Sequence, residues 1–167
     1  MNITKAFPES DLEVYIVNDV LSADAMKTLT KLFLGHLPTG YKQDEINQAQ
    51  ADIVAASVKA CEQAFDASGL IPVAANPKWP WFDLHVGDGR TVEENGVYEF
   101  VSTPVGFYAD FCIIPSTVGG EISFKNGEHK VQLKAGQMLI GPRVENHEFT
   151  VETILEGSRF TLMTFMG

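Results

Sequence analysis

The stretch from Phe107 to Met166 decides the fold, and it reads FYADFCIIPSTVGGEISFKNGEHKVQLKAGQMLIGPRVENHEFTVETILEGSRFTLMTFM. Short runs rich in β-branched and aromatic residues alternate here with turn pairs, namely Gly119-Gly120, Asn126-Gly127 and Ala135-Gly136. No spacing of three to four residues between apolar positions survives, so the pattern is not helical. Short strands separated by turn residues predict a sandwich, a barrel or a jelly roll.

The same pattern begins upstream, after Asn76-Pro77. We expect a small jelly-roll cup between about Trp81 and Met166, with His147 and Arg159 facing its interior. Eight strands are predicted in it: Phe82–Val86, Val97–Ser102, Phe107–Ile114, Glu121–Phe124, Lys130–Lys134, Gln137–Ile140, His147–Thr153 and Arg159–Phe165.

The N-terminal part carries one predicted strand, Leu12–Val17, and two predicted helices. The first helix begins after Ser22, a good N-cap, and ends at Gly35; the second runs from about Asp44 to Phe65. Helices placed before a set of strands are expected to pack on the outside of one sheet. The predicted fold class is therefore α+β, mainly β: a double-stranded β-helix, or jelly roll, with two supporting helices.

The length of 167 residues suits one domain and is too short for two well-buried ones. We expect a single domain over residues 1–167, with the strand and helices in 1–76 and the jelly-roll core in 77–167. The cysteines Cys61 and Cys112 stand in apolar contexts, which predicts buried thiols rather than a disulfide or a metal pair.

The net charge is −10, with 22 acidic residues against 12 basic ones. Such a surface repels phosphate groups, so neither nucleic acid nor an anionic membrane is expected as a partner. The sequence has no signal-peptide pattern and no apolar run of about 20 residues, the length of a membrane span. A cytoplasmic location is expected.

The histidines are the first candidates for chemistry. His36 and His129 lie in a helix end and a turn, where exposed residues are the ordinary expectation. His85 is centred in a predicted strand, where it either shares a face with Asp83 or stands alone. His147 follows a polar turn and begins a predicted strand, which is a suitable position for an imidazole at the rim of a cup.

The arginine at position 159 begins the last predicted strand, among strongly apolar residues. A guanidinium in that position either reaches outward to solvent or holds an anion with two hydrogen bonds. From the residues alone, both readings stay open.

Five short motifs of the second half resemble the prolyl-hydroxylase-like dioxygenases, which depend on Fe(II) and 2-oxoglutarate. The opening Val14–Ser22, followed by a helix, is also similar to the usual start of that superfamily. The resemblance implies a double-stranded β-helix in which His147 is the distal iron ligand and Arg159 binds the distal carboxylate of 2-oxoglutarate. The motifs are Gly119-Gly-Glu-Ile-Ser-Phe124, Val131-Gln-Leu-Lys-Ala-Gly136, Met138-Leu-Ile-Gly-Pro142, His147-Glu-Phe149 and Gly157-Ser-Arg-Phe-Thr-Leu162.

The sequence departs from the superfamily at the paired iron ligands. Those enzymes carry a His-x-Asp or His-x-Glu pair, and neither occurs anywhere in this chain. The stretches that could align with the pair keep a carboxylate, Glu99 or Asp110, and lose the histidine. His85 is the remaining histidine that loops could bring near His147. The candidate metal ligands are therefore His147, Glu99, Asp110 and His85.

Three functions follow from these residues. The first is a hydroxylase-type oxidoreductase acting on a small molecule or a protein side chain with Fe(II) and 2-oxoglutarate, if the metal site is complete. The second is a catalytically inactive dioxygenase fold that serves as a structural, assembly (for example virion) or binding module with a protein partner. In that case Arg159 is a buried or interface ion-pair partner. The third is a cupin-like small-molecule binder, because Gly136, Pro142 and His147 resemble the second cupin motif.

Overall fold

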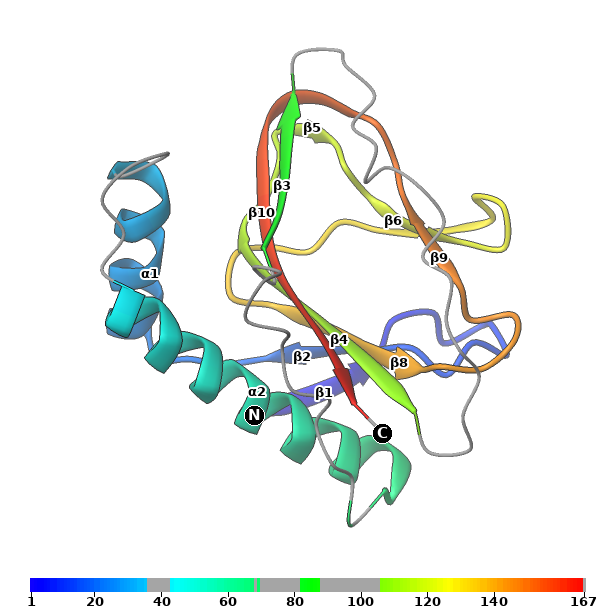
Figure 1. Cartoon of the computed structure of the whole chain (residues 1–167). Coiled ribbons are helices and arrows are strands. Elements are labelled where there is room, and N and C mark those ends of the chain that lie inside the picture. Colours follow the sequence, from blue (N-terminus) through cyan, green and yellow to red (C-terminus); the bar gives the residue numbers. More distant parts are fainter. Residues whose placement is uncertain (36–42, 68, 70–81, 88–105, 167) are drawn as a thin grey trace.

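The computed structural model of the chain describes residues 1–35, 43–67, 69, 82–87 and 106–166. The helices α1 (Ala23–Gly35) and α2 (Gln43–Phe65) lie on one side of a large twisted sheet, and a smaller sheet lies on the other side (Figure 1). Neither described helix combines the length and the apolar character that crossing a lipid bilayer requires.

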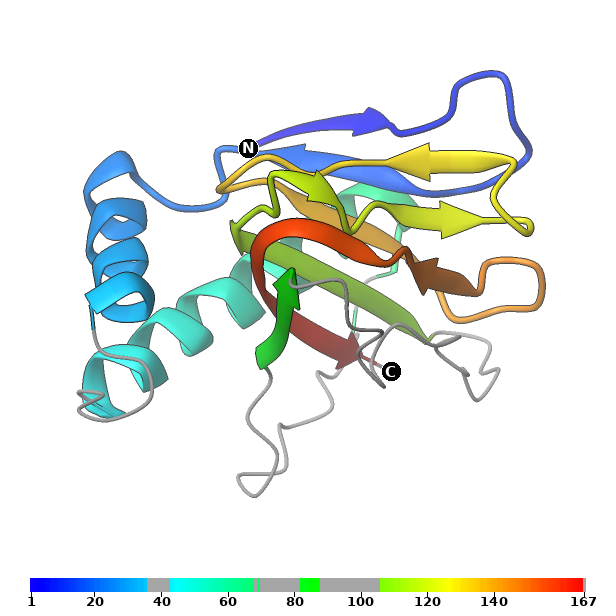
Figure 2. The same ribbon diagram turned by 90° about the horizontal axis from the view of Figure 1, so that it is seen from above.

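Within the described residues the large sheet has seven strands, with the order β1-β2-β8-β4-β10-β3 and β5 paired to β10, and its pairings are antiparallel. The N-terminal strands lie beside strands of the C-terminal half (Figure 2). The bounds are β1 (Asn2–Lys5), β2 (Tyr15–Asn18), β3 (Phe82–Gly87), β4 (Phe107–Ile114), β5 (Val118–Gly119), β8 (Met138–Pro142) and β10 (Ile154–Met166).

The small sheet has the order β7-β6-β9, again with antiparallel pairing. It contains β6 (Ile122–Phe124), β7 (His129–Val131) and β9 (Phe149–Val151). The predicted turn between β6 and β7 is present, and both Asn126 and Gly127 adopt positive φ angles, 56° and 89°. Asparagine and glycine tolerate that conformation best, which explains the turn at this point of the sequence.

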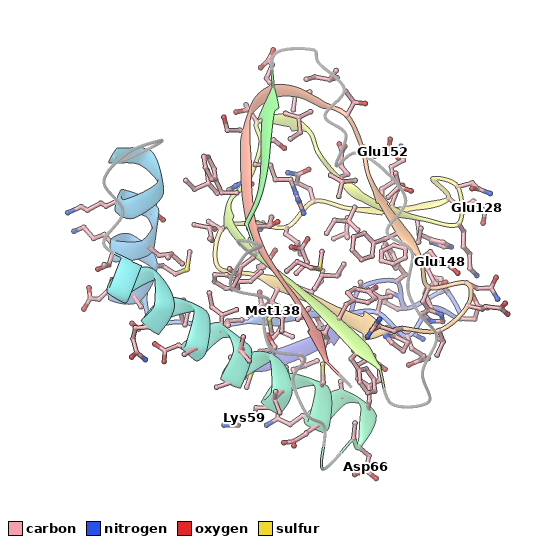
Figure 3. All side chains as sticks on the ribbon, in the orientation of Figure 1. Lys59, Asp66, Glu128, Met138, Glu148 and Glu152 are labelled. Atoms are coloured by element: carbon pink, nitrogen blue, oxygen red, sulfur yellow. The ribbon has the colours of Figure 1, made fainter. Side chains whose placement is uncertain are left out.

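One hydrophobic core lies between the helices and the large sheet. On the helix side Ile53 and Cys61 of α2 are buried, and on the sheet side Phe111 and Met138 are buried. The Ser57 hydroxyl lies 3.2 Å from the sulfur of Met138, which joins α2 to β8. Figure 3 places Met138 between helix and sheet, with Lys59 of α2 and Asp66, which directly follows α2, directed away from the sheet.

A second hydrophobic core fills the space between the two sheets. Tyr108 and Leu139 enter it from the large sheet, and Phe124 and Phe149 enter it from the small one. The rings of Tyr108 and Phe149 are 5.0 Å apart. Because β4 contributes to both cores, its residues are buried on both faces, which accounts for its continuous apolar run.

Several predictions from sequence are confirmed. The described part of the chain is mainly antiparallel β with two helices, and β4 has the predicted bounds. Ser22 caps α1, since its hydroxyl accepts a hydrogen bond of 3.1 Å from the Ala25 amide. Cys61 and Cys112 are buried free thiols.

Other predictions were wrong in their boundaries. The predicted strand Leu12–Val17 corresponds to β2, which begins later, at Tyr15, and its hairpin partner β1 was missed. Arg159 does not begin its strand: β10 starts at Ile154 and passes through Gly157, which has a positive φ angle of 82°. His147 lies in the turn before β9, which begins at Phe149. The predicted strand Val97–Ser102 lies outside the described residues.

Candidate functional site

The Arg159 side chain points into the molecule. Only 3% of the residue is exposed, which rules out the outward-reaching alternative. Its Nη2 donates a hydrogen bond of 2.7 Å to Oδ2 of Asp110, and its Nη1 donates one of 3.3 Å to the hydroxyl of Thr161. Asp110 is fully buried. A guanidinium and a carboxylate at this distance form a charge-assisted bond, which is stronger than a neutral one.

The strands explain why these two charges meet. Side chains alternate along β10, so Thr161 and Met163 point between the sheets while Phe160 and Leu162 pack toward the helices. Asp110 lies directly opposite Met163 in the register. The long side chain of Arg159 therefore reaches along the strand to a carboxylate presented by β4.

Gly120 lies beside the stem of the arginine and close to Ser116. A Cβ added there would lie 3.4 Å from Cδ of Arg159 and 2.5 Å from the hydroxyl of Ser116. The Ser116 hydroxyl itself donates a hydrogen bond of 2.6 Å to the Gly119 carbonyl and fixes this turn. A side chain at position 120 would therefore collide with Ser116 and disturb this turn, whereas its distance from the arginine would be an ordinary packing distance.

The surroundings of the pair have a low polarity. Burial raises the pKa of the Tyr108 hydroxyl well above its usual value, and the nearby Asp110 carboxylate raises it further. Burial raises the pKa of the Cys112 thiol to about 12, with Asp110 adding to the effect and Arg159 opposing it. Among the described residues, Oδ1 of Asp110 has no hydrogen-bond partner. The pair is therefore set in an apolar interior, with one carboxylate oxygen unsatisfied.

His147 contacts main-chain groups through both ring nitrogens. Its Nε2 accepts a hydrogen bond of 3.0 Å from the Glu13 amide, so the ring hydrogen of the neutral imidazole belongs on Nδ1. Nδ1 lies 3.2 Å from the Glu145 carbonyl, the acceptor that this tautomer needs. The imidazole therefore fastens the N-terminal segment to the turn before β9. The iron-ligand role of His147 stays a prediction.

The sheet register separates the position of His85 from that of Asp110. His85 lies opposite Arg159 in the β3–β10 register, whereas Asp110 lies opposite Met163, four positions further along β10. At a strand rise of roughly 3.3 Å per residue, this is about 13 Å along the sheet, on opposite sides of β10. Glu99 lies outside the described residues. In the part of the chain that the structure describes, no three His, Cys, Asp or Glu residues gather as a metal site would require.

Three solved structures illustrate what the chain resembles. A viral collagen prolyl hydroxylase from Paramecium Bursaria Chlorella virus-1, in complex with 2-oxoglutarate, has a TM-score of 0.59 and 9% identity over 93% of this chain and 96% of that one. The non-haem α-ketoglutarate-dependent carbocyclase SnoK of nogalamycin biosynthesis has a TM-score of 0.59 and 11% identity, covering 99% and 87%. HygX from Streptomyces hygroscopicus, with nickel and 2-oxoglutarate bound, has a TM-score of 0.52 and 9% identity, covering 93% and 82%.

The chain shares its fold with 2-oxoglutarate-dependent oxygenases. At these identities the likeness concerns the fold alone. Comparison with models of known protein families finds no match, and neither does comparison with curated proteins.

The residues of the described site do not fit 2-oxoglutarate and iron as they are arranged. The guanidinium that the resemblance assigns to the co-substrate already holds a carboxylate of the chain. Both nitrogens of the histidine that it assigns to iron already contact main-chain groups.

The pairing of Asp110 with Arg159 was not predicted, although the sequence carries a signal for it. Asp110 is the lone charge in the apolar run Phe107–Ile114, and Arg159 is the lone cation of the last strand. A charge inside a buried strand needs an opposite charge, so two such residues in one small core are candidates for a pair.

Proposed function

We propose that this chain is a double-stranded β-helix of the dioxygenase type that works as a binding or assembly module and does not consume 2-oxoglutarate. The observation that carries the proposal is the buried ion pair of Arg159 with Asp110, at 2.7 Å. The arginine that would orient the co-substrate is neutralised from within the chain.

The energetics favour the internal carboxylate over an external one. Asp110 is held beside Arg159 by the fold, so 2-oxoglutarate would compete with a tethered group of high effective concentration. Displacing Asp110 would also leave a buried carboxylate unpaired. The loss of one partner of a buried pair costs about 3–5 kcal/mol, which would be subtracted from the binding energy of the co-substrate.

The position of His147 supports the same conclusion. For Nε2 to bind a metal ion, it would have to release the Glu13 amide and with it the contact to the N-terminal segment. The loss of this contact would add to the cost of separating Asp110 from Arg159.

The second core fills the space between the sheets, so a binding partner would have to contact the outer surface of the molecule. Glu128, Glu148 and Glu152 lie on the side opposite the helices (Figure 3). Because the net charge of this chain is −10, its outer surface should bind another protein more readily than it binds the negatively charged backbone of a nucleic acid.

The direct test is an assay for 2-oxoglutarate turnover. The wild-type protein is incubated with Fe(II), ascorbate and 2-oxoglutarate, and succinate is measured by mass spectrometry, with an active prolyl hydroxylase as the positive control. Calorimetric titration with 2-oxoglutarate in the presence of Mn(II) measures binding separately. We expect succinate at the level of the protein-free blank and no binding heat. Stoichiometric binding, or catalytic formation of succinate, would refute the proposal.

One observation favours an active oxygenase as the second candidate. The β3–β10 register sets position 85 opposite Arg159, and directly opposite positions of an antiparallel pair share one face of the sheet. His85 would then supply the missing histidine, provided that Asp110 releases the arginine. If the turnover assay is positive, its loss in both His85→Ala and Arg159→Met would establish this candidate.

A further inference from the structure

We propose that Asp110 is an internal ligand: its carboxylate fills a carboxylate-binding site built around Arg159 and so closes the site to external acids. This inference rests on the proposed function and deepens it, because it names the residue that decides what the interior can bind.

The Arg159 side of the site is buried and has a hydrogen-bond partner besides Asp110. Arg159 is only 3% exposed, and the Thr161 hydroxyl accepts a hydrogen bond of 3.3 Å from its Nη1. The guanidinium is therefore held inside the protein by a contact that does not involve Asp110. Guanidinium groups held in this way are the usual receptors of carboxylates in proteins, because their planar array of N–H donors matches the two carboxylate oxygens.

The carboxylate of Asp110 has fewer hydrogen bonds than it can accept. Oδ1 of Asp110 has no hydrogen-bond partner among the described residues, although the residue is fully buried. The register neighbours of Asp110 on both adjacent strands are apolar, Leu139 and Met163. Buried carboxylate oxygens are normally satisfied, and an unsatisfied one requires an explanation. The unsatisfied Oδ1 is explained if Asp110 takes the place of a free acid, because such a carboxylate is bound through the arginine alone.

The inference defines the class of ligand that an opened site would take. Removing the side chain of Asp110 leaves a space of the shape of acetate, facing a buried positive charge. Small monocarboxylates should enter it, while neutral molecules of the same shape should not, because only the anion compensates Arg159.

The test is chemical rescue of Asp110→Gly. The thermal midpoint of this variant is measured in increasing acetate, with acetamide as the neutral analogue and chloride at equal ionic strength as the salt control. We expect acetate to raise the midpoint by several degrees in a saturable manner, because a ligand that binds only the folded state stabilises it. Acetamide and chloride should have no such effect. The wild-type protein and the double variant Asp110→Gly/Arg159→Met should not respond to acetate.

Each outcome either supports or overturns the inference about Asp110. A response to acetate that requires Arg159 supports the inference, as does refolding of Asp110→Gly from urea in acetate but not in chloride. An equal response to acetamide, or none to acetate, would mean a structural ion pair only. If the glycine variant does not fold in either salt, Asp110→Ala with formate is the second test, and failure of both variants overturns the inference. Binding of 2-oxoglutarate by the wild-type protein would instead refute the proposed function.

Discussion

In the part of the chain that the structure describes, Asp110 and Arg159 are the two charged residues that are fully buried. Taking each charge out of water costs several kcal/mol, and their mutual attraction offsets this cost only while both are present. The pair therefore contributes little net stability, yet the loss of either partner has a large effect.

This asymmetry gives a prediction for the pair. Arg159→Met should lower the free energy of unfolding by about 3–5 kcal/mol, because Asp110 loses its partner. The double variant Asp110→Leu/Arg159→Met should recover to within about 1 kcal/mol of the wild type or exceed it. Urea unfolding measures both. Lys130→Met, which breaks the exposed Lys130–Glu152 pair of 3.3 Å, is the control and should cost less than about 1 kcal/mol. A double variant as unstable as the single one would contradict this account.

The buried thiols give a prediction for alkaline pH. Burial raises the pKa of Cys61 and of Cys112 from 9.0 to about 12. The unfolded chain therefore loses these protons first, so the stability they provide is complete below pH 9.0 and declines as pH rises toward about 12. Urea unfolding across this range should show a steeper decline for the wild type than for Cys61→Ala/Cys112→Ala. Parallel slopes would show that the thiols ionise in the folded state.

His147 is expected to act on the N-terminal segment. His147→Ala removes the acceptor of the Glu13 amide, and the contact is partly exposed, so water replaces it and the cost should be about 0.5–1.5 kcal/mol. Hydrogen exchange followed by NMR should report faster exchange at the Glu13 amide. Lys130→Met, which removes an exposed ion pair with Glu152, is the control and should leave that amide unchanged. Unaltered protection at Glu13 in His147→Ala would refute the contact.

The strands and helices differ in how well the sequence predicts them. Both helices and β4 follow from local signals. These are the Ser22 cap, the continuous apolar run of Phe107–Ile114, and the helical spacing of the apolar residues of α2, namely Ile46, Ala49, Ile53, Cys61 and Phe65. The β1–β2 hairpin and the length of β10 depend on pairing with strands distant in sequence. Pattern within a short window cannot supply that information.

The pairing of β4 with β8 gives a prediction at this scale. A Cβ added at Gly141 would lie 2.4 Å from the hydroxyl of Tyr108 and 2.6 Å from Cζ of its ring. Because this ring is fully buried, Gly141→Ala should destabilise the protein by about 1–3 kcal/mol through overpacking. In a Tyr108→Leu background, the same substitution should cost clearly less, and urea unfolding of the four proteins measures the coupling. An equal cost in both backgrounds would exclude the clash as the cause.

At the scale of the whole molecule, β4 and β10 contribute residues to both hydrophobic cores and so connect the helices with the small sheet. One face of these strands packs against the helices, and the other face carries Asp110 and Arg159 into the space between the sheets. The sequence predicts that Arg159 belongs to a cup, because its strand pattern and motifs are local. The partner of Arg159 stands 49 residues away on another strand, so it follows only from matching the two lone charges of the core and not from the local motifs.

The crystal structure of the wild-type protein, grown with Mn(II) and a saturating concentration of 2-oxoglutarate, tests the central claim most directly. We expect Nη2 of Arg159 within hydrogen-bond distance of Asp110, as in the 2.7 Å contact described above, and no 2-oxoglutarate at the guanidinium. A 2-oxoglutarate carboxylate bound to Arg159, with the Asp110 side chain turned away, would contradict the account.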